Sequence, residues 1–439
     1  MQWEKLTSPK RFGKESAAPL SAESMRSEFQ RDYDRIIFSS PFRRLQNKTQ
    51  VFPLPGSVFV HNRLTHSLEV ASVGRSLGNR VAALLKKKYP NTPYLSDIDT
   101  IVSAASLAHD LGNPPFGHAG EKAISDYFFS GKGQQYKNKM TPAQWNDLIH
   151  FEGNANALRL LTHSFNGRRY GGFVLTHATL ASLVKYPFSS EKKTKKNKYG
   201  YFVPEANTFK SIATETGLIK DAEGNYCRHP LVYLVEAADD ISYQIMDIED
   251  AHKLGILSTD ETTALLMSFF DPVADAAFLN KKNEVVKEVT DKNEQIAFLR
   301  ASVINHLVAQ VSAIFIENEG LLLSGMFKGV MVDYLPETSK KAMEQCAETA
   351  WHKIYNHRSV IEIEITGYNV LNTLLDNYIT AQLDEKTGYS KKLLSLLPLQ
   401  YKENHTGCYS KIRSVLDFIS GMTDLYALDL HKLIKGIGI

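Results

Sequence analysis

Residues 101–121 read IVSAASLAHDLGNPPFGHAGE, and this stretch decides the fold class of the 439-residue chain. Its first half carries apolar side chains at three and four residue spacing, which predicts the buried face of a helix. Gly112-Asn113-Pro114-Pro115 must end that helix, because proline removes backbone donors and glycine permits a reversal of the chain. The adjacent His109 and Asp110 therefore lie at a helix end, beside a break that can open a cavity.

The same helical spacing recurs along most of the sequence, and it predicts an all-α fold with at most short local strands. The clearest further helices are expected at residues 63–86, 231–251, 296–316, 338–352 and 368–383. Alternation typical of a strand is confined to short runs such as 360–365. Because no linker rich in proline, glycine or serine divides the chain, we expect a single elaborated helical domain over residues 1–439.

Composition and charge are those of an ordinary soluble protein. Hydrophobic residues make up 43% and charged residues 23%, which excludes wholesale disorder. A net charge of +3 argues against a polybasic, histone-like partner, and three scattered cysteines exclude a disulfide framework. No signal peptide is visible, and the most apolar run, 302–316, contains polar residues and predicts a buried helix. We therefore expect a cytoplasmic protein with no membrane partner.

Two further segments supply side chains that could join His109 and Asp110 in binding a metal ion. His66 lies on an apolar helical line, where a histidine is either hydrogen-bonded in the core or a ligand. Asp239 shares the apolar face of its predicted helix, and a carboxylate there must be paired or bind a cation. Asp239 is therefore the better ligand candidate. Asp240 faces the polar side and is the better candidate for a salt bridge or solvent contact.

The order His66, His109-Asp110, Asp239 resembles the H…HD…D pattern of the HD-domain metal phosphohydrolases. The resemblance extends over six blocks in order, from about Phe29 to Leu428, and these blocks are similar to the deoxyguanosine triphosphate triphosphohydrolase family. The blocks are FRRLQNKTQVF, RLTHSLEV, HDLGNPPFGHAGE, FEGNANALRLL, EAADDISY and SGMTDLYA. The sequence departs from the commoner FEGNAQ pattern of that family at Asn156.

This resemblance implies an all-α HD-domain core, with the metal site within about residues 60–255. It implies that residues 256–439 complete a nucleotide pocket and form an oligomer interface. The implied reaction is attack of water on the α-phosphorus of a deoxynucleoside triphosphate, dGTP above all, releasing the deoxynucleoside and tripolyphosphate. Two imidazoles and two carboxylates suit one divalent metal ion and leave two coordination positions for water and substrate. We expect Mn²⁺ or Mg²⁺ before the alternatives Fe, Co, Ni and Zn.

The resemblance also assigns roles to residues that match the family's motifs. His118 and Glu121 occupy the positions of a catalytic histidine and its orienting acid, a pairing that fixes the histidine tautomer. The implied metal ligands are His66, His109, Asp110 and Asp239. The implied phosphate contacts are Arg43, Arg44 and Lys185. Tyr243 is implied as a sugar contact, Asp247 as a sugar or base contact, and Glu364 as a contact to the base edge. Val51 is a further implied substrate contact, and Arg413 is implied to reach in from a neighbouring subunit.

Two other classes of function stay open at this point. An HD-type nucleotidase or phosphodiesterase would keep the fold and release a different product. A nucleic-acid-binding regulator with a vestigial site is the second, because the run KKTKKNK at 192–198 fits either a solvated loop or a phosphate contact. The family resemblance implies a homo-oligomer, possibly a hexamer, and allows single-stranded DNA or a nucleotide as an effector.

Overall fold

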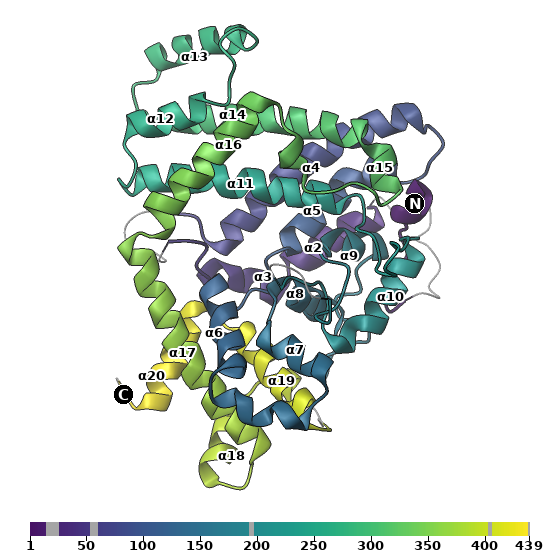
Figure 1. The fold of residues 1–439 in the computed structure, drawn as a ribbon, viewed down its shortest axis with the longest axis vertical. Helices are drawn as coiled ribbons and strands as arrows, with labels where there is room; N and C mark the ends of the chain where they lie inside the picture. The colour runs from purple at the N-terminus through teal and green to yellow at the C-terminus, as the bar shows by residue number, and fades with distance from the viewer. Residues whose placement is uncertain (15–25, 53–59, 193–196, 403–405, 438–439) are drawn as a thin grey trace.

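Helices form the regular structure of the chain. The computed structural model describes residues 1–14, 26–52, 60–192, 197–402 and 406–437 (Figure 1). Within these ranges there is no strand, and β pairing is limited to isolated bridges such as the one between Thr49 and Asn62. The all-α prediction is confirmed.

A first hydrophobic core holds the upper part of the molecule in Figure 1. Helix α4 packs against α5, α11 and α14, and α2 covers the other side of α5. The central helices are α2 (Glu28–Ile37), α4 (Arg63–Lys88), α5 (Ile98–Ala108), α11 (Val232–Lys253) and α14 (Lys292–Glu317). Around them lie α1 (Trp3–Leu6), α3 (Ser40–Arg44), α8 (Gly153–Thr162), α9 (His177–Leu183), α10 (Ala206–Glu215), α12 (Thr259–Met267), α13 (Ala276–Glu288), α15 (Glu319–Leu323) and α16 (Glu337–Thr349).

A second core lies below the first in Figure 1, where the long helix α17 packs against α6 and α19. Its buried centre includes Leu371, Leu375 and Tyr378, all at 0% exposure. Its helices are α6 (Gly117–Phe129), α7 (Pro142–Ile149), α17 (Arg358–Leu383), α18 (Gly388–Ser395), α19 (Cys408–Ser420) and α20 (Asp424–Lys435). The cores therefore do not divide the chain at residue 255, because α12 and α16 join the first core whereas α6 and α7 join the second.

Shorter helical segments connect these elements. The 3-10 segments are Leu45–Asn47, Leu95–Asp97, Lys132–Lys139, Val203–Glu205, Met331–Tyr334 and Leu399–Tyr401, and Ala350–Tyr355 is a π-helix between α16 and α17. A π-helix is rare and is found frequently at functional sites.

The predicted helices are present, with ends that differ by a few residues. The one wrong local prediction is the strand at 360–365, which the structure places in the first two turns of α17. The alternation of isoleucine and glutamate there is accommodated because Ile361 and Ile365 stand on the exposed side of the helix. The opposite side of α17 is buried at Val360, Gly367 and Val370, which recur at helical spacing. This burial overrides the local alternation that predicted a strand.

Helix α14 is long and apolar enough to cross a membrane by length and composition alone. Its apolar side instead packs against α4 and α11 in the first core, where Val303, Leu307 and Val311 are buried. The prediction of a buried helix at 302–316 is confirmed.

Candidate metal site and its cavity

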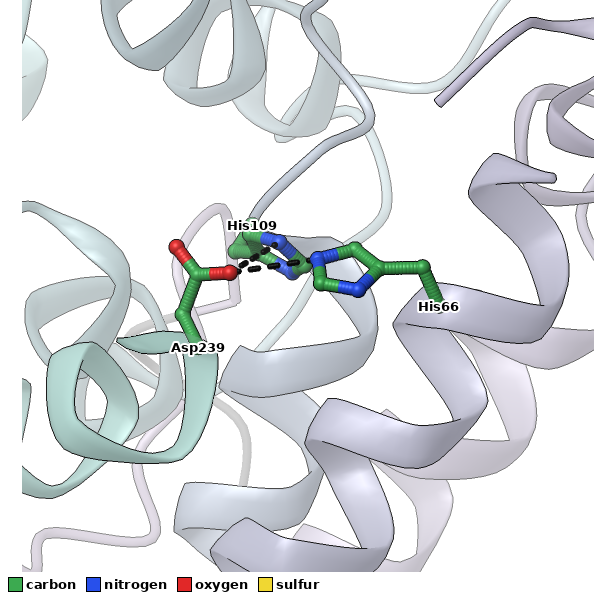
Figure 2. A group of neighbouring side chains, drawn as sticks. All are labelled: His66, His109 and Asp239. Atoms are coloured by element: carbon green, nitrogen blue, oxygen red, sulfur yellow. Dashed lines mark hydrogen bonds and ion pairs between the residues drawn. The ribbon is translucent and has the colours of Figure 1, made fainter. Parts of the chain in front are cut away.

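Three side chains from three different helices meet where α4, α5 and α11 converge (Figure 2). The carboxylate Oδ1 of Asp239 lies 3.1 Å from Nε2 of His66 and 3.5 Å from Nε2 of His109. One ligand atom from each residue lies within 4.8 Å of the other two. A single ion could therefore contact all three residues.

Each of these side chains is placed by its helix. His66 is 2% exposed, because its line on α4 continues through the buried Val70, Val73 and Leu77. Helix α5 ends at Ala108, so His109 is its C-cap, as the sequence predicts. The Nδ1 of His109 donates to the Ser106 carbonyl at 2.6 Å, which fixes the tautomer and turns the Nε2 lone pair toward the cluster.

Asp110 lies beside this cluster and is held by two other residues. Its Oδ2 accepts from Nη1 of Arg63 at 2.6 Å, and its Oδ1 accepts from Nδ2 of Asn113 at 2.5 Å. The same Oδ1 is 3.6 Å from Nε2 of His109. These bonds orient the carboxylate and leave oxygen lone pairs, so Asp110 as the fourth ligand stays a prediction.

The ionisable side chains of the cluster and of Asp110 shift one another's pKa values. Burial lowers the pKa of His109, but the carboxylates of Asp110 and Asp239 outweigh it and raise that pKa to about 9. Burial raises the pKa of Asp110, but Arg63 and the two imidazoles outweigh it and lower that pKa to about 2. His109 and His66 hold the pKa of Asp239 well below its ordinary value against the effect of burial. The two anionic carboxylates thus attract a cation, which is the electrostatic condition for a metal site.

The donor set fits a divalent metal ion. Imidazole nitrogen suits Mn²⁺, Fe²⁺, Co²⁺ or Zn²⁺, and carboxylate oxygen suits Mg²⁺ as well. His109 has its other ring nitrogen bonded to a backbone carbonyl, and such a bond is typical of a metal-binding histidine.

The cluster opens into a cavity of about 320 Å³. A cavity of this size falls at the lower end of the range for small-molecule sites. Its lining residues come from α4, α6, α8, α9 and α11 and from the segments between helices: Gln50, Arg63, His66, His109, Asp110, Asn113, His118, Glu121, Glu152, Asn154, Leu183, Lys185, Tyr186, Lys198, Val232, Val235, Glu236, Asp239, Asp240 and Tyr243.

His118 and Glu121 form the expected pair in the first turn of α6. The Nδ1 of His118 is 2.9 Å from Oε2 of Glu121, and the hydrogen bond to this carboxylate raises the pKa of the histidine. Glu121 is fixed in turn by the backbone N–H of Gly153 at 2.7 Å. A Cβ at Gly153 would lie 2.2 Å from Oδ1 of Asn113 and 2.6 Å from Oε1 of Glu121, so a larger residue here would displace both side chains. His118 itself is 83% exposed and presents its free ring edge to the cavity.

Two lysines and three glutamates also line the cavity. Lys185 pairs with Glu236 at 2.9 Å, and Lys198 pairs with Glu152 at 2.8 Å and lies 3.7 Å from Glu121. Glu236 outweighs burial and raises the pKa of Lys185, so this amine stays protonated. Lys198 belongs to the basic run at 192–198, and its side chain is directed into the cavity rather than to solvent; residues 193–196 lie outside the described ranges.

Tyr243 lines the cavity next to the cluster, with its ring centroid 6.5 Å from that of His66. Tyr355, in the π-helix, stacks on Tyr243 at 6.0 Å and 19°. The hydroxyl of Tyr355 donates to Oδ2 of Asp247 at 2.7 Å. Asp247 is therefore buried behind the tyrosine pair and does not line the cavity, and its predicted contact with the sugar stays a prediction.

Five other predicted residues lie away from this cavity. Arg43 is exposed, Arg44 lines a different cavity, and Val51 packs on the first core. The phosphate contacts of the two arginines and the pocket contact of Val51 stay predictions. Glu364 is exposed on α17, where its contact with the base is untested. Arg413 is 2% exposed, with its guanidinium carbon 3.8 Å from the centroid of the Phe202 ring. The second core encloses Arg413 in this chain, and its predicted contact with a neighbouring subunit stays a prediction.

The sequence reasoning missed several lining residues. Arg63, in the block RLTHSLEV, could have been predicted from the sequence, because it stands one helical turn before His66. A buried arginine at that position needs an acidic partner. Gln50 lies near the end of the block FRRLQNKTQVF, and it lines the metal cavity, whereas Arg43 and Arg44 of the same block do not. Asn156, where the sequence departs from its relatives' pattern, donates to the Gly112 carbonyl at 2.8 Å and so fixes the loop after Asp110.

Comparison with known proteins decides the family. Residues 63–143 match the HD domain, and residues 334–433 match the phosphohydrolase-associated domain. A deoxyguanosinetriphosphate triphosphohydrolase-like protein of Pseudomonas aeruginosa is 36% identical over 99% of both chains, and one of Synechocystis sp. is 38% identical over 100% of both. The chain belongs to this family of HD phosphohydrolases. The deoxyguanosinetriphosphate triphosphohydrolase of Yersinia pestis is 30% identical, with 98% of this chain and 97% of its own covered.

Membership of the HD family makes the chain a hydrolase and implies a divalent metal ion. The HD match spans His66, His109, Asp110, His118 and Glu121, and the third helix of the cluster, which carries Asp239, follows it in the chain. The resemblance stated from the sequence is confirmed.

Proposed function

We propose that this HD-family enzyme hydrolyses deoxynucleoside triphosphates, dGTP above all, to the deoxynucleoside and tripolyphosphate. The observation that carries the proposal is the joint placement of two functional groups in one cavity. The cluster of His66, His109 and Asp239 lies inside it, and the hydrogen-bonded pair of His118 and Glu121 lines the same space. A metal ion that polarises the phosphoryl group and a histidine that transfers a proton are together suited to hydrolysis of a phosphate ester.

The bound ion, Mn²⁺ or Mg²⁺, would supply charge that polarises the phosphoryl oxygens and lowers the pKa of water. His66, His109, Asp239 and Asp110 would hold it. The Asp110 carboxylate is already oriented for this by Arg63.

His118 is placed to manage a proton at the leaving 5′ oxygen. Glu121 holds Nδ1, so the other ring nitrogen is free to face the bound ester. The hydrogen bond to Glu121 also raises the pKa of His118, which favours the protonated imidazole that donation to the leaving oxygen requires. Attack of water at the α-phosphorus then breaks the bond from phosphorus to the 5′ oxygen, and that oxygen receives the proton as the deoxynucleoside leaves.

The lysines on the far side of the cavity fit the phosphate chain. Lys185 and Lys198 are each paired with a carboxylate of the chain, and an incoming triphosphate would compete for both. Tyr243 stands between the cluster and Tyr355, where its ring would pack against a deoxyribose and leave no room for a 2′-hydroxyl.

The family resemblance supports a homo-oligomer, and the burial of α14 in the first core supports a soluble, cytoplasmic enzyme. The experiment that tests the function is incubation of the full chain with each dNTP and Mn²⁺ or Mg²⁺, with both products identified. The proposal expects tripolyphosphate as the sole inorganic product. Orthophosphate or pyrophosphate would instead assign the site to a nucleotidase, and opening of a diester would assign it to a phosphodiesterase.

A further inference from the structure

The block SGMTDLYA, at 420–427, lies far along the chain from the metal cluster and has no part in the proposed reaction so far. It spans the turn between α19 and α20, within the match to the phosphohydrolase-associated domain. Asp424 is the first residue of α20 and is 6% exposed. A carboxylate this deeply buried needs hydrogen-bond donors, and its donors indicate what it holds in place.

Both carboxylate oxygens of Asp424 accept hydrogen bonds from the backbone of other segments. Oδ1 accepts from the N–H of Phe116 at 2.9 Å, and Oδ2 accepts from the N–H of Thr49 at 2.8 Å. The start of α20 is capped by the hydroxyl of Thr423, which accepts from the N–H of Tyr426. The Asp424 carboxylate therefore ties two distant segments to the turn before α20.

A lysine beside Thr49 connects the same segments. Lys48 is 2% exposed, and its Nζ donates to the carbonyl of Asn113 at 2.5 Å and to the carbonyl of Ser420 at 2.8 Å. Buried charge-assisted bonds of this kind are costly to break, because a lost partner leaves a polar group without water or protein to bind it. The bonds of Lys48 and Asp424 thus form one junction, which fixes the turn before α6 at both of its ends.

The turn held by this junction leads directly to His118. Phe116 is the N-cap of α6 and has a φ of 63°, a left-handed conformation that is uncommon for a residue other than glycine. Gly117 follows with a φ of 56°, and His118 is the second residue of the helix. Such backbone strain persists where the surrounding structure imposes it, and it is concentrated at functional sites. The bond from Phe116 to Asp424 is a contact that imposes it here.

The turn is closely packed on two further sides. A Cβ at Gly367 of α17 would lie 2.6 Å from the Cβ of Phe116, so the phenylalanine approaches that helix closely. A Cβ at Gly117 would lie 2.4 Å from Nη2 of Arg63, whose other terminal nitrogen orients the carboxylate beside the metal cluster. A shift of the turn would therefore move His118 relative to that cluster.

We propose that Asp424 is a positioning residue: by holding the N–H of Phe116, it sets His118 at the place in the metal cavity where it can transfer a proton to the leaving group. Asp424 does not line the cavity, so its effect passes through the backbone of Phe116 and Gly117. The proposal rests on the proposed function, because it concerns the proton that His118 donates. It gives the C-terminal part of the chain a role in the chemical step.

The test is a double-mutant cycle of Asp424→Asn and His118→Ala, measured on dGTP hydrolysis by the full chain with Mn²⁺. Asparagine keeps the shape of the side chain, but its NH₂ group cannot accept the bond from one of the two N–H donors. Asp424→Asn should lower kcat by about 10-fold to 100-fold, since a small misplacement of a reacting group has an effect of this size. The KM for dGTP and the affinity for Mn²⁺ should stay unchanged.

The cycle separates positioning of His118 from a general loss of structure. In the His118→Ala background the imidazole is gone, so adding Asp424→Asn should lower kcat by less than about 2-fold further. A residue that only stabilises the fold would lower kcat by the same factor in both backgrounds. Asp429→Asn is the matched control on α20, because the side chain of Asp429 is 74% exposed and pairs with Lys432 at 3.8 Å. It should keep the parental kcat.

Two further measurements keep the test valid if Asp424→Asn fails to fold. Lys48→Met breaks the junction from its other side and should lower kcat in the same way, again only where His118 is present. Amide hydrogen exchange of the parent chain needs neither a variant nor a substrate. The N–H of Phe116 should exchange slowly there, because Asp424 holds it.

Three results would overturn the proposal: a parental kcat for Asp424→Asn, an equal loss of kcat in both backgrounds, or rapid exchange of the Phe116 amide in the parent. Failure of the proposed function would look different. In that case the parent chain itself would hydrolyse no deoxynucleoside triphosphate.

Discussion

Replacing Asp239 with asparagine removes the only carboxylate of the three-residue cluster and keeps its shape. Asp239 Oδ1 lies 3.1 Å and 3.5 Å from the two histidine nitrogens, so an ion that contacts the histidines also contacts this oxygen. Two unit charges ~4 Å apart attract by about 4 kcal/mol at an effective dielectric constant of about 20, and a divalent ion doubles that figure. The amide oxygen of asparagine recovers part of the loss. We therefore expect Asp239→Asn to weaken Mn²⁺ binding by at least about 4 kcal/mol, or ~10³-fold.

Asp240→Asn is the matched control, because it makes the same change one residue away on α11. Asp240 lines the cavity but is not one of the three clustered residues, so we expect its replacement to change Mn²⁺ affinity by less than about 10-fold. Calorimetric titration with Mn²⁺ and the initial rate of dGTP hydrolysis should rank the variants in the same order, with circular dichroism confirming that both are folded. A larger loss for Asp240→Asn than for Asp239→Asn would refute the assignment of the ligand.

Three further predictions concern His118 and Tyr243, which line the cavity, and Asp247, which is buried behind Tyr243. His118→Ala should lower kcat for dGTP by ~10²–10⁴-fold and leave the affinity for Mn²⁺ unchanged, as measured by steady-state assays on protein of known metal content. An unchanged kcat would show that His118 does not take part in the proton transfer. Tyr243→Ala should lower the ratio of kcat/KM for dGTP to kcat/KM for GTP. A variant that rejects GTP as strongly as the parent would show that another residue excludes the 2′-hydroxyl. Burial raises the pKa of Asp247 from its ordinary 3.8 to about 8. The folded chain then holds one more proton than the unfolded chain between these pH values, so the free energy of unfolding should fall as pH rises from about 4 to about 8. Asp247→Asn should flatten this dependence on pH, as measured by urea titrations at several pH values. An equal slope in both proteins would contradict a buried, protonated Asp247.

The metal cluster could be predicted from the sequence because its signal is local and strong. His109 and Asp110 precede a break that prolines enforce, and Asp239 falls on the apolar side of a long helix. The structure places Asp239 against His66 and His109, which is the cation-binding environment that a carboxylate on that face requires.

The parts that could not be predicted depend on how side chains are directed after the chain folds. Arg43 and Arg44 are consecutive at the end of a short helix, so they diverge by about 100° around its axis. Only the packing of α3 decides that Arg44 lines a cavity and that Arg43 is exposed. Lys198 belongs to a charged run that is typical of a solvated loop, but Glu152 and Glu121, distant in sequence, draw it into the metal cavity. The stacking of Tyr355 on Tyr243 depends on a π-helix, for which the sequence offers no periodic signal.

The measurement that tests the central claim most directly is hydrolysis of dGTP in water enriched in ¹⁸O, with Mn²⁺ and mass analysis of both products. Attack of water on the α-phosphorus predicts one ¹⁸O atom in each tripolyphosphate and none in the deoxyguanosine. Label in the 5′-hydroxyl of the deoxynucleoside would show attack on carbon. Label in orthophosphate or pyrophosphate would show cleavage elsewhere in the phosphate chain, and either result would contradict the account of how His118 and the metal cluster work together.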